Sequence, residues 1–213
     1  MTQVRVLRVF TDQAGRSGNL LGVVRDAAAI EHARRQAIAT ELGYSETVFV
    51  ERDTEVQIFT PATELPFAGH PLVGSAWLLR HPALHVAAGE VRTRVQGERA
   101  WVLARAQWCP SFERRQLDSP AEVDDFAAPA SGSLQVWAWQ DEARGSIRAR
   151  VFAPDLGVPE DPATGSATVV LCAALDRAIT VDQGPHCLIE AQPLGGGVIE
   201  LGGRVADDGL RDV

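Results

Sequence analysis

The sequence predicts an α+β protein built as two pseudo-symmetric lobes, and three observations support this prediction. Short segments in which apolar and polar residues alternate run along the whole chain, as expected for strands. Two segments, 69–79 and 167–175, are apolar on nearly all sides, which is typical of buried helices. Phe-Thr-Pro at 59–61 and Phe-Ala-Pro at 152–154 each precede a glycine-containing loop and one of these helices. The repeated order of strand, loop and helix predicts one such unit in each lobe.

The first lobe is expected over residues 1–105. Its alternating segments predict strands at 4–10, 20–24, 46–50, 56–59, 90–95 and 100–106. Between the second and third strands, helical spacing predicts a helix over 26–43, with Asp26 as its N-cap and Gly43 as its stop. The apolar residues that this spacing places on the inward face are Ile30, Ala33, Ala37, Ile38 and Leu42.

The second lobe is expected over residues 106–213. Residues 110–133 are rich in Pro, Ser and Asp, so the boundary between the lobes is placed around 106–133. Strands are predicted at 134–140, 146–152, 187–192, 198–201 and 203–207.

Composition excludes several classes of function. The chain has 213 residues and a net charge of −8, and no cluster of arginines offers a face for nucleic acid. No run of about 18 apolar residues occurs, so no membrane association is expected. The N-terminus lacks the layout of a signal peptide, which predicts a cytoplasmic protein. The odd number of cysteines predicts neither disulfides nor a zinc site, but buried thiols: Cys109, Cys172 and Cys187.

Familiar catalytic and cofactor motifs are missing from the sequence. No phosphate-binding lysine follows a glycine-rich stretch, no G-x-G-x-x-G opens a strand–helix unit, and no G-x-S-x-G occurs. His81 and His85 have the spacing of a metal pair, but Pro82 argues against a helix there, so surface histidines are expected. The sequence therefore contains no nucleotide-binding motif and no hydrolase nucleophile motif, and it gives no support for a metal pair at the two histidines.

Two glycine-rich helix starts, "AGHPLVGSA" and "PATGSA", are candidate anion sites, because helix N-termini present unpaired N–H groups and a positive dipole end. The alternative is that each is only a cap and a turn. Glu46 runs directly into an apolar strand, where partial burial favours proton transfer, although a lone glutamate is usually solvated. His70 lies at a helix start, either as a neutral catalytic ring or as a capping or core histidine.

Four stretches together resemble one known family. "SETVFV", "IFTPATELPFAGHPLVGSA", "RVFAPDLGVPEDPATGSA" and the closing "GGRV" are similar to the PhzF-like isomerases of phenazine biosynthesis, as is the opening "VFTDQAGRSGNLLGVV". The resemblance covers residues 1–105 and 134–213. It implies the diaminopimelate-epimerase-like fold, in which each lobe curls a sheet around a central helix and the active site lies between the lobes.

The resemblance also implies the roles of individual residues. Glu46 would be the acid/base that moves a proton on a small unsaturated carboxylic acid, assisted by His70 and Asp161. Substrate-binding positions would be Ser45, Gly69, Thr164, Gly165 and Ser166. The resemblance implies no metal and no organic cofactor, and a homodimer is expected. Related racemases on this fold use two cysteines where this chain has Ala68 and Ala163, which excludes a two-thiol mechanism.

This chain departs from the family pattern in its second lobe. Family members carry an additional strand and a helical crossover near the 106–133 joint, and this chain lacks them. The alternative to an isomerase is therefore a non-catalytic protein that binds or senses small acids on a decayed scaffold.

Overall fold

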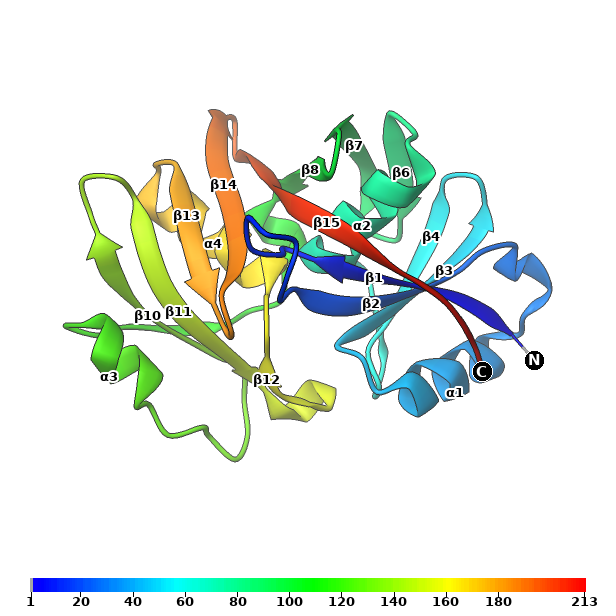
Figure 1. Ribbon diagram of the computed structural model, residues 1–213, viewed down its shortest axis with the longest axis horizontal. Coiled ribbons are helices and arrows are strands. Elements are labelled where there is room, and N and C mark those ends of the chain that lie inside the picture. The colour runs from blue at the N-terminus through cyan, green and yellow to red at the C-terminus, as the bar shows by residue number, and fades with distance from the viewer. Residues whose placement is uncertain (1) are drawn as a thin grey trace.

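The computed structural model describes residues 2–213. These residues form fifteen β-strands, four α-helices and three short 3-10 turns (Figure 1). The strands join edge to edge into one continuous sheet, and the helices pack on it. This mostly stranded, mixed α/β architecture confirms the predicted combination of sheets and helices. No helix within 2–213 combines the length and the apolar character needed to cross a membrane.

Eight strands close into a barrel. Each pairs with the next in the order β1, β2, β3, β4, β6, β7, β8 and β15, and β15 pairs back with β1. Closure leaves none of these strands as a free edge around the ring. The strands are β1 (Gln3–Val9), β2 (Asn19–Val24), β3 (Glu46–Arg52), β4 (Glu55–Phe59), β6 (Ala83–Val86), β7 (Gly89–Gln96), β8 (Arg99–Arg105) and β15 (Val198–Asp212).

The remaining strands continue the sheet away from the barrel, beyond β15. In order they are β14 (Cys187–Gly195), β13 (Ile179–Gln183), β11 (Ser146–Ala153), β10 (Leu134–Asp141) and β9 (Glu113–Gln116). Two short strands pair alongside this path: β12 (Val158–Asp161) on β11 and β5 (Glu64–Leu65) on β4. The predicted hairpin of β7 and β8 and the predicted pairing of β10 with β11 are both confirmed.

Strand β15 belongs to both parts of the sheet. Its first residues pair with β14 on one side and with β8 on the other, and its later residues pair with β1. In Figure 1 it is the long red strand that crosses between the two halves of the molecule.

Helix α2 (Gly69–Leu79) packs against β1, β2, β3, β7, β8 and β15, and therefore fills the barrel. Helix α4 (Gly165–Leu175) packs against β14, β15 and α2. Both helices are apolar on nearly all sides, as the sequence predicted, because each is surrounded by protein. Helices α1 (His32–Leu42) and α3 (Pro120–Asp124) lie outside, as do the turns η1 (Ala27–Ala29), η2 (Ala106–Trp108) and η3 (Pro154–Leu156).

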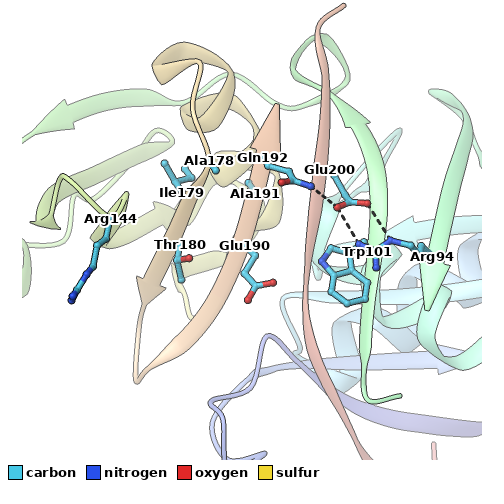
Figure 2. Close-up of a pocket in the computed structure, with 10 residues that line it drawn as sticks. All are labelled: Arg94, Trp101, Arg144, Ala178, Ile179, Thr180, Glu190, Ala191, Gln192 and Glu200. Carbon is cyan, nitrogen blue, oxygen red and sulfur yellow. Dashed lines mark hydrogen bonds and ion pairs between the residues drawn. The ribbon is translucent and has the colours of Figure 1, made fainter. Parts of the chain in front are cut away.

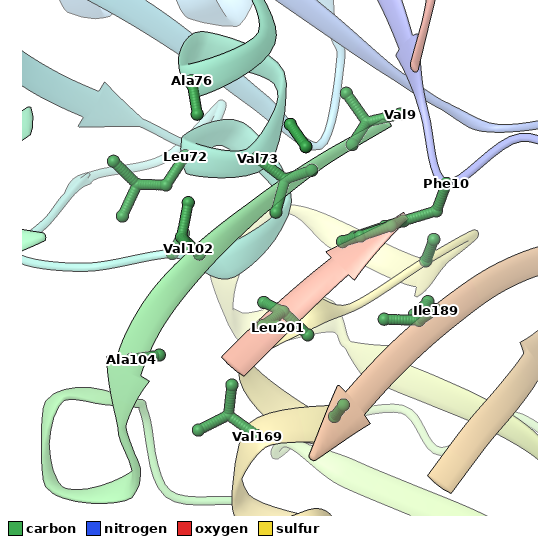
Figure 3. Close-up of a cluster of buried hydrophobic side chains, with 14 of the residues drawn as sticks. Val9, Phe10, Leu72, Val73, Ala76, Val102, Ala104, Val169, Ile189 and Leu201 are labelled. Carbon is green, nitrogen blue, oxygen red and sulfur yellow. The ribbon is translucent and has the colours of Figure 1, made fainter. Parts of the chain in front are cut away.

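One hydrophobic core connects the two inner helices. Leu72 and Val73 of α2 pack with Val102 of β8, and Leu201 of β15 extends the same cluster toward Val169 of α4 (Figure 3). All of these side chains are fully buried. Packing of these leucine and valine side chains thus sets the position of α2 relative to α4.

The prediction of a continuous helix over 26–43 is wrong at its start. Residues 27–29 form the turn η1, and α1 begins at His32. Asp26 precedes η1 but makes no capping hydrogen bond, whereas Gly43 ends α1 with φ 64°, as predicted. The buried face is also different: Arg35, Ile38, Ala39 and Leu42.

The 110–133 joint, where the sequence analysis expected a strand and a helical crossover to be missing, contains strand β9 (Glu113–Gln116) followed by helix α3. Strand β9 extends the sheet beside β10, and Ser119 caps α3 by accepting a hydrogen bond from the Glu122 N–H. Strands β6, β12 and β13 were also missed. The two predicted strands at 198–201 and 203–207 are one strand, β15.

Candidate active site

Glu46 and His70 form a hydrogen-bonded pair between β3 and α2. Glu46 is the first residue of β3, and its Oε2 lies 2.7 Å from Nδ1 of His70, the second residue of α2. His70 is buried, and its Nε2 has no hydrogen-bond partner in the described chain. In the neutral tautomer that donates from Nδ1–H to the Glu46 carboxylate, Nε2 carries no proton. The neutral ring then orients the carboxylate without neutralising it.

Asp161 is the centre of a second group of buried polar side chains. It ends β12, and three donors surround its carboxylate: Asn19 Nδ2 lies 2.6 Å and Ser45 Oγ 2.8 Å from Oδ1, and Thr164 Oγ1 lies 2.6 Å from Oδ2. The Gln183 amide donates to the Asp161 carbonyl and accepts from the Thr164 N–H. Every neighbour of the carboxylate is a donor, so this arrangement suits an ionised aspartate.

The Asp161 carboxyl nonetheless titrates close to neutrality. Burial raises its pKa to about 6, and the charge of Glu46 adds to this rise, while His70 and the donors Thr164 and Ser45 lower the pKa. Desolvation disfavours the charged form, and the donors recover part of that loss. Near pH 7 the carboxylate is therefore mostly ionised.

The N-termini of α2 and α4 touch each other. A Cβ added to Gly69 would lie 2.8 Å from the backbone carbonyl carbon of Gly165, and one added to Gly165 would lie 2.8 Å from the His70 backbone nitrogen. Only glycine allows this approach. The N-cap residues are Ala68 and Thr164, and neither side chain accepts a hydrogen bond from its own helix. Two positive helix ends with uncapped N–H groups thus meet at one point, which favours an anion there.

A small pocket joins these groups. Its volume is about 30 Å³, room for a few water molecules. Its polar lining includes Glu46 and Asp161, together with Ser45, Thr60, Thr164 and Ser166. Its apolar lining comes from both halves of the chain: Leu65, Pro110, Phe112, Val151, Ala153, Leu156 and Val158. The pocket is therefore lined by both polar and apolar side chains.

The predicted residues take different places around this pocket. Glu46 and Asp161 line it, as do Ser45, Thr164 and Ser166. The remaining predicted residues are Gly69, His70 and Gly165, and they lie behind these residues, where the two helix ends meet. Sequence reasoning missed Asn19 and Gln183, which hold Asp161 and its loop from two distant strands.

Larger pockets exist elsewhere, but none of the predicted site residues lines them. One of about 310 Å³ lies over β13, β14, β15 and β8 (Figure 2). Arg94 stacks on Trp101 there and bonds to Glu200 at 3.1 Å, and Glu200 also accepts from Gln192. Arg94 and Glu200 are thus paired with each other, while the other two charged lining residues, Arg144 and Glu190, pair with Asp141 and Arg99 outside the pocket.

None of the three cysteines is suited to act as a catalytic thiol. Burial raises the pKa of Cys109 and Cys172 to about 12 and that of Cys187 to about 11, so all three stay protonated at neutral pH. Cys172 and Cys187 are buried as predicted, but Cys109 is only half-buried. All three cysteines are free, and no group of metal-ligating side chains occurs within residues 2–213.

Fold and sequence together define the class of this protein. The PhzC-PhzF family, described as phenazine biosynthesis-like protein, matches residues 7–124 and 101–192. The chain therefore belongs to this family, as the resemblance in its motifs predicted. A phenazine biosynthesis PhzC/PhzF protein of Clostridium difficile shares the fold, with a TM-score of 0.79 at 18% identity, over 100% of this chain and 99% of that chain.

Two relatives with sequence similarity to this chain are named as isomerases. The trans-2,3-dihydro-3-hydroxyanthranilate isomerase of Pseudomonas fluorescens is 28% identical over 208 residues, covering 75% of this chain and 75% of the relative. An uncharacterized isomerase of Mesorhizobium japonicum is 45% identical over 87 residues, and this match spans 38% of this chain and 28% of the relative. The family relatives of this chain are thus isomerases.

Proposed function

We propose that this protein is a cofactor-independent isomerase that moves a proton on a small unsaturated carboxylic acid. The observation that carries the proposal is the hydrogen-bonded pair of buried His70 and partly buried Glu46, 2.7 Å apart, at the edge of a pocket that Glu46 lines. A carboxylate held by a neutral ring is an oriented base, and the same group returns the proton as an acid. The names of the isomerase relatives support the reaction type.

The proton transfer needs no redox partner. Glu46 takes a proton from a saturated carbon next to the conjugated system of the acid, and the electron pair of that C–H bond shifts into the conjugated system. Negative charge then builds on the substrate carboxylate, where the uncapped N–H groups of α2 and α4 would stabilise it. Glu46 returns the proton to another carbon of the same system, so the product is an isomer.

Asp161 has a supporting role in this proposal. Its charge lies in the same pocket as Glu46, and the donors Asn19, Ser45 and Thr164 fix its position. A substrate hydroxyl or amino group would find its hydrogen-bond acceptor there. The relative from Pseudomonas fluorescens is named for a hydroxylated dihydro acid with an amino group, and a substrate of this kind fits the proposed arrangement.

Deuterium uptake from heavy water into dihydro-hydroxy aromatic or enoyl acids tests the proposal. We expect Glu46→Gln to slow the exchange by about 10²–10⁴-fold, because the amide can neither accept nor return the proton. The matched control is Glu64→Gln: Glu64 also bonds to a histidine, His32, at 2.8 Å, but on the surface. Exchange in this control should equal that of the wild type.

The alternative, a protein that binds small acids without turnover, makes a different prediction. An acid would then bind with equal affinity to the wild type and to Glu46→Gln, and neither protein would exchange deuterium faster than the solvent alone. That result would overturn the isomerase proposal.

Two finer features of the fold and assembly are part of the proposal. We interpret the barrel around α2 and the sheet around α4 as pseudo-symmetric lobes, because both inner helices span 11 residues, begin with glycine and are buried. The homodimer and the cytoplasmic location stay predictions from the resemblance and the sequence.

A further inference from the structure

The pocket beside Glu46 is too small for any carboxylic acid that the proposed function requires. Its volume of about 30 Å³ compares with about 300–1,000 Å³ for pockets that hold small-molecule ligands. Part of its wall must therefore move before an acid can reach Glu46. The walls come from three places: the loop at η3 and β12, strand β11, and the segment between η2 and β9.

The wall at η3 and β12 is held by several contacts. The Gly132 N–H bonds to the Asp155 carboxylate at 2.9 Å, and the Gly157 N–H bonds to the Pro154 carbonyl at 3.0 Å. β12 pairs with β11. A Cβ at Gly157 would lie 3.5 Å from Pro61 Cβ, so this loop already meets the barrel across the pocket. This side of the pocket is thus tied to β11 and to Gly132 by hydrogen bonds.

Residues 110–112 form the opposite wall and are held only at their ends. Before them, the Cys109 N–H bonds to the Ala106 carbonyl, and the Trp108 ring packs on Phe67 with centroids 5.8 Å apart. After them, the Glu113 N–H bonds to the Ser133 carbonyl, where β9 begins. No hydrogen bond joins residues 110–112 themselves to the rest of the described chain. Few hydrogen bonds mean a low free energy of local opening.

We propose that Pro110–Phe112 is the movable wall of the pocket and that Phe112 sets the size of the acid that enters. This inference rests on the proposed function for its ligand class, a small unsaturated carboxylic acid, taken here as one that contains a ring. Phe112 is the largest apolar side chain of the lining, it is half-buried, and it lies on the unbonded segment. None of the lining residues carries a positive charge, so the acid would be recognised by its carboxylate at the N-terminus of α4, where Thr164 and Ser166 line the pocket, and by its ring at Phe112.

Calorimetric titration with benzoate and with 2-naphthoate tests this inference without requiring turnover. In the wild type we expect benzoate to bind and 2-naphthoate to bind about tenfold more weakly, because a second ring meets Phe112. Phe112→Ala removes the obstacle and should abolish this preference. The matched control is Phe126→Ala, a half-buried phenylalanine that packs on Phe152 away from the pocket, and it should keep the wild-type preference.

Hydrogen exchange gives a second measurement on the unmodified protein. The amides of Ser111 and Phe112 should exchange rapidly without ligand and more slowly with saturating benzoate, while the amides of β11 stay protected in both. Unchanged exchange at Ser111 and Phe112 would overturn the movable wall. An unchanged preference for benzoate in Phe112→Ala would overturn its role in size selection.

The outcomes separate this inference from the proposed function. If benzoate binds, the size preference shifts in Phe112→Ala and no acid exchanges deuterium, the movable wall holds and the isomerase proposal fails. If neither acid binds to any of the three proteins, the anion site is absent and the inference fails with it.

Discussion

Asp161 is a buried carboxylate that three side-chain donors reach, and its protonation links the site to stability. Burial raises its pKa from 3.8 to about 6. Between about pH 4 and pH 6 the folded chain therefore holds a proton that the unfolded chain has released. The contribution of Asp161 to the free energy of unfolding therefore falls as the pH rises through this window, because ionisation of this group costs more in the folded state than in the unfolded one.

We expect Asp161→Asn to remove this dependence on pH. The asparagine cannot ionise, so from pH 4 to pH 6 the free energy of unfolding should fall less, or rise more, than in the wild type, as measured by urea unfolding at a series of pH values. Asp53→Asn, at the exposed turn between β3 and β4, is the control. A variant with the same slope as the wild type would show that another group titrates in this window.

Asn19 is expected to position Asp161. Asn19→Ala removes the donor 2.6 Å from Asp161 Oδ1 and leaves the Ala163 carbonyl without its side-chain partner. Losing a donor to a buried charge should lower the free energy of unfolding by about 1–3 kcal/mol. It should also raise the pKa of Asp161. On acidification, the rate of deuterium exchange into the substrate should then begin to fall at a higher pH than in the wild type. A loss of stability with an unmoved pH profile would make Asn19 only structural.

The residues that the sequence identified and those that it missed differ in how far their partners lie along the chain. Glu46, His70 and Asp161 stand inside distinctive local motifs, so a single stretch points to each of them. Asn19 lies 142 residues from Asp161, and Gln183 lies in a short strand that was not predicted. An asparagine in a loop-like stretch and a glutamine at a strand end look like surface residues until the fold places them.

At the scale of elements, the contact between the N-termini of α2 and α4 creates the proposed anion site. A Cβ at Gly165 would lie 2.8 Å from the His70 backbone nitrogen and 2.9 Å from the Gly69 carbonyl carbon. Backbone atoms cannot turn aside as a flexible side chain can, so an added methyl group must push the two helix ends apart.

Gly165→Ala should therefore destabilise the fold by about 1–3 kcal/mol and weaken the binding of benzoate. Calorimetric titration and urea unfolding measure the two effects separately. The control is Gly196→Ala, at a hairpin turn where a Cβ meets nothing within 4 Å but φ is 59°. That variant should lose stability through backbone strain alone, and its affinity for benzoate should equal that of the wild type.

The elements that the sequence predicted well are those with a strong pattern of their own. The fully apolar helix α2 was predicted with its observed bounds, and the hairpin of β7 and β8 follows from alternation around a short turn. The start of α1 was wrong because three alanines suit a helix, while the observed chain turns at η1 before the helix begins. Strands β6, β9 and β13 are short, and pairing with other strands of the sheet forms them rather than a strong pattern of their own.

At the scale of the whole molecule, β15 makes the two halves one unit. Val198 to Gly202 pair with β14 of the outer sheet and with β8 of the barrel, and the strand then closes the barrel against β1. Closure of the barrel and attachment of the outer sheet depend on the same strand, a property that no local segment of sequence displays. The halves are thus expected to unfold together.

Leu201 lies at the centre of this shared strand and gives the test of cooperativity. It is fully buried, and its Cδ2 lies where a Cβ at Gly69 or at Gly165 would have to fit, so it supports both helix ends. Leu201→Ala should lower the free energy of unfolding by about 2–5 kcal/mol in one transition, seen at the same urea concentration by tryptophan fluorescence and by circular dichroism. Leu210→Ala, on the same strand but 57% exposed, should change it by about 0.5 kcal/mol or less. Two separate transitions in Leu201→Ala would show instead that the barrel and the outer sheet fold independently despite the strand they share.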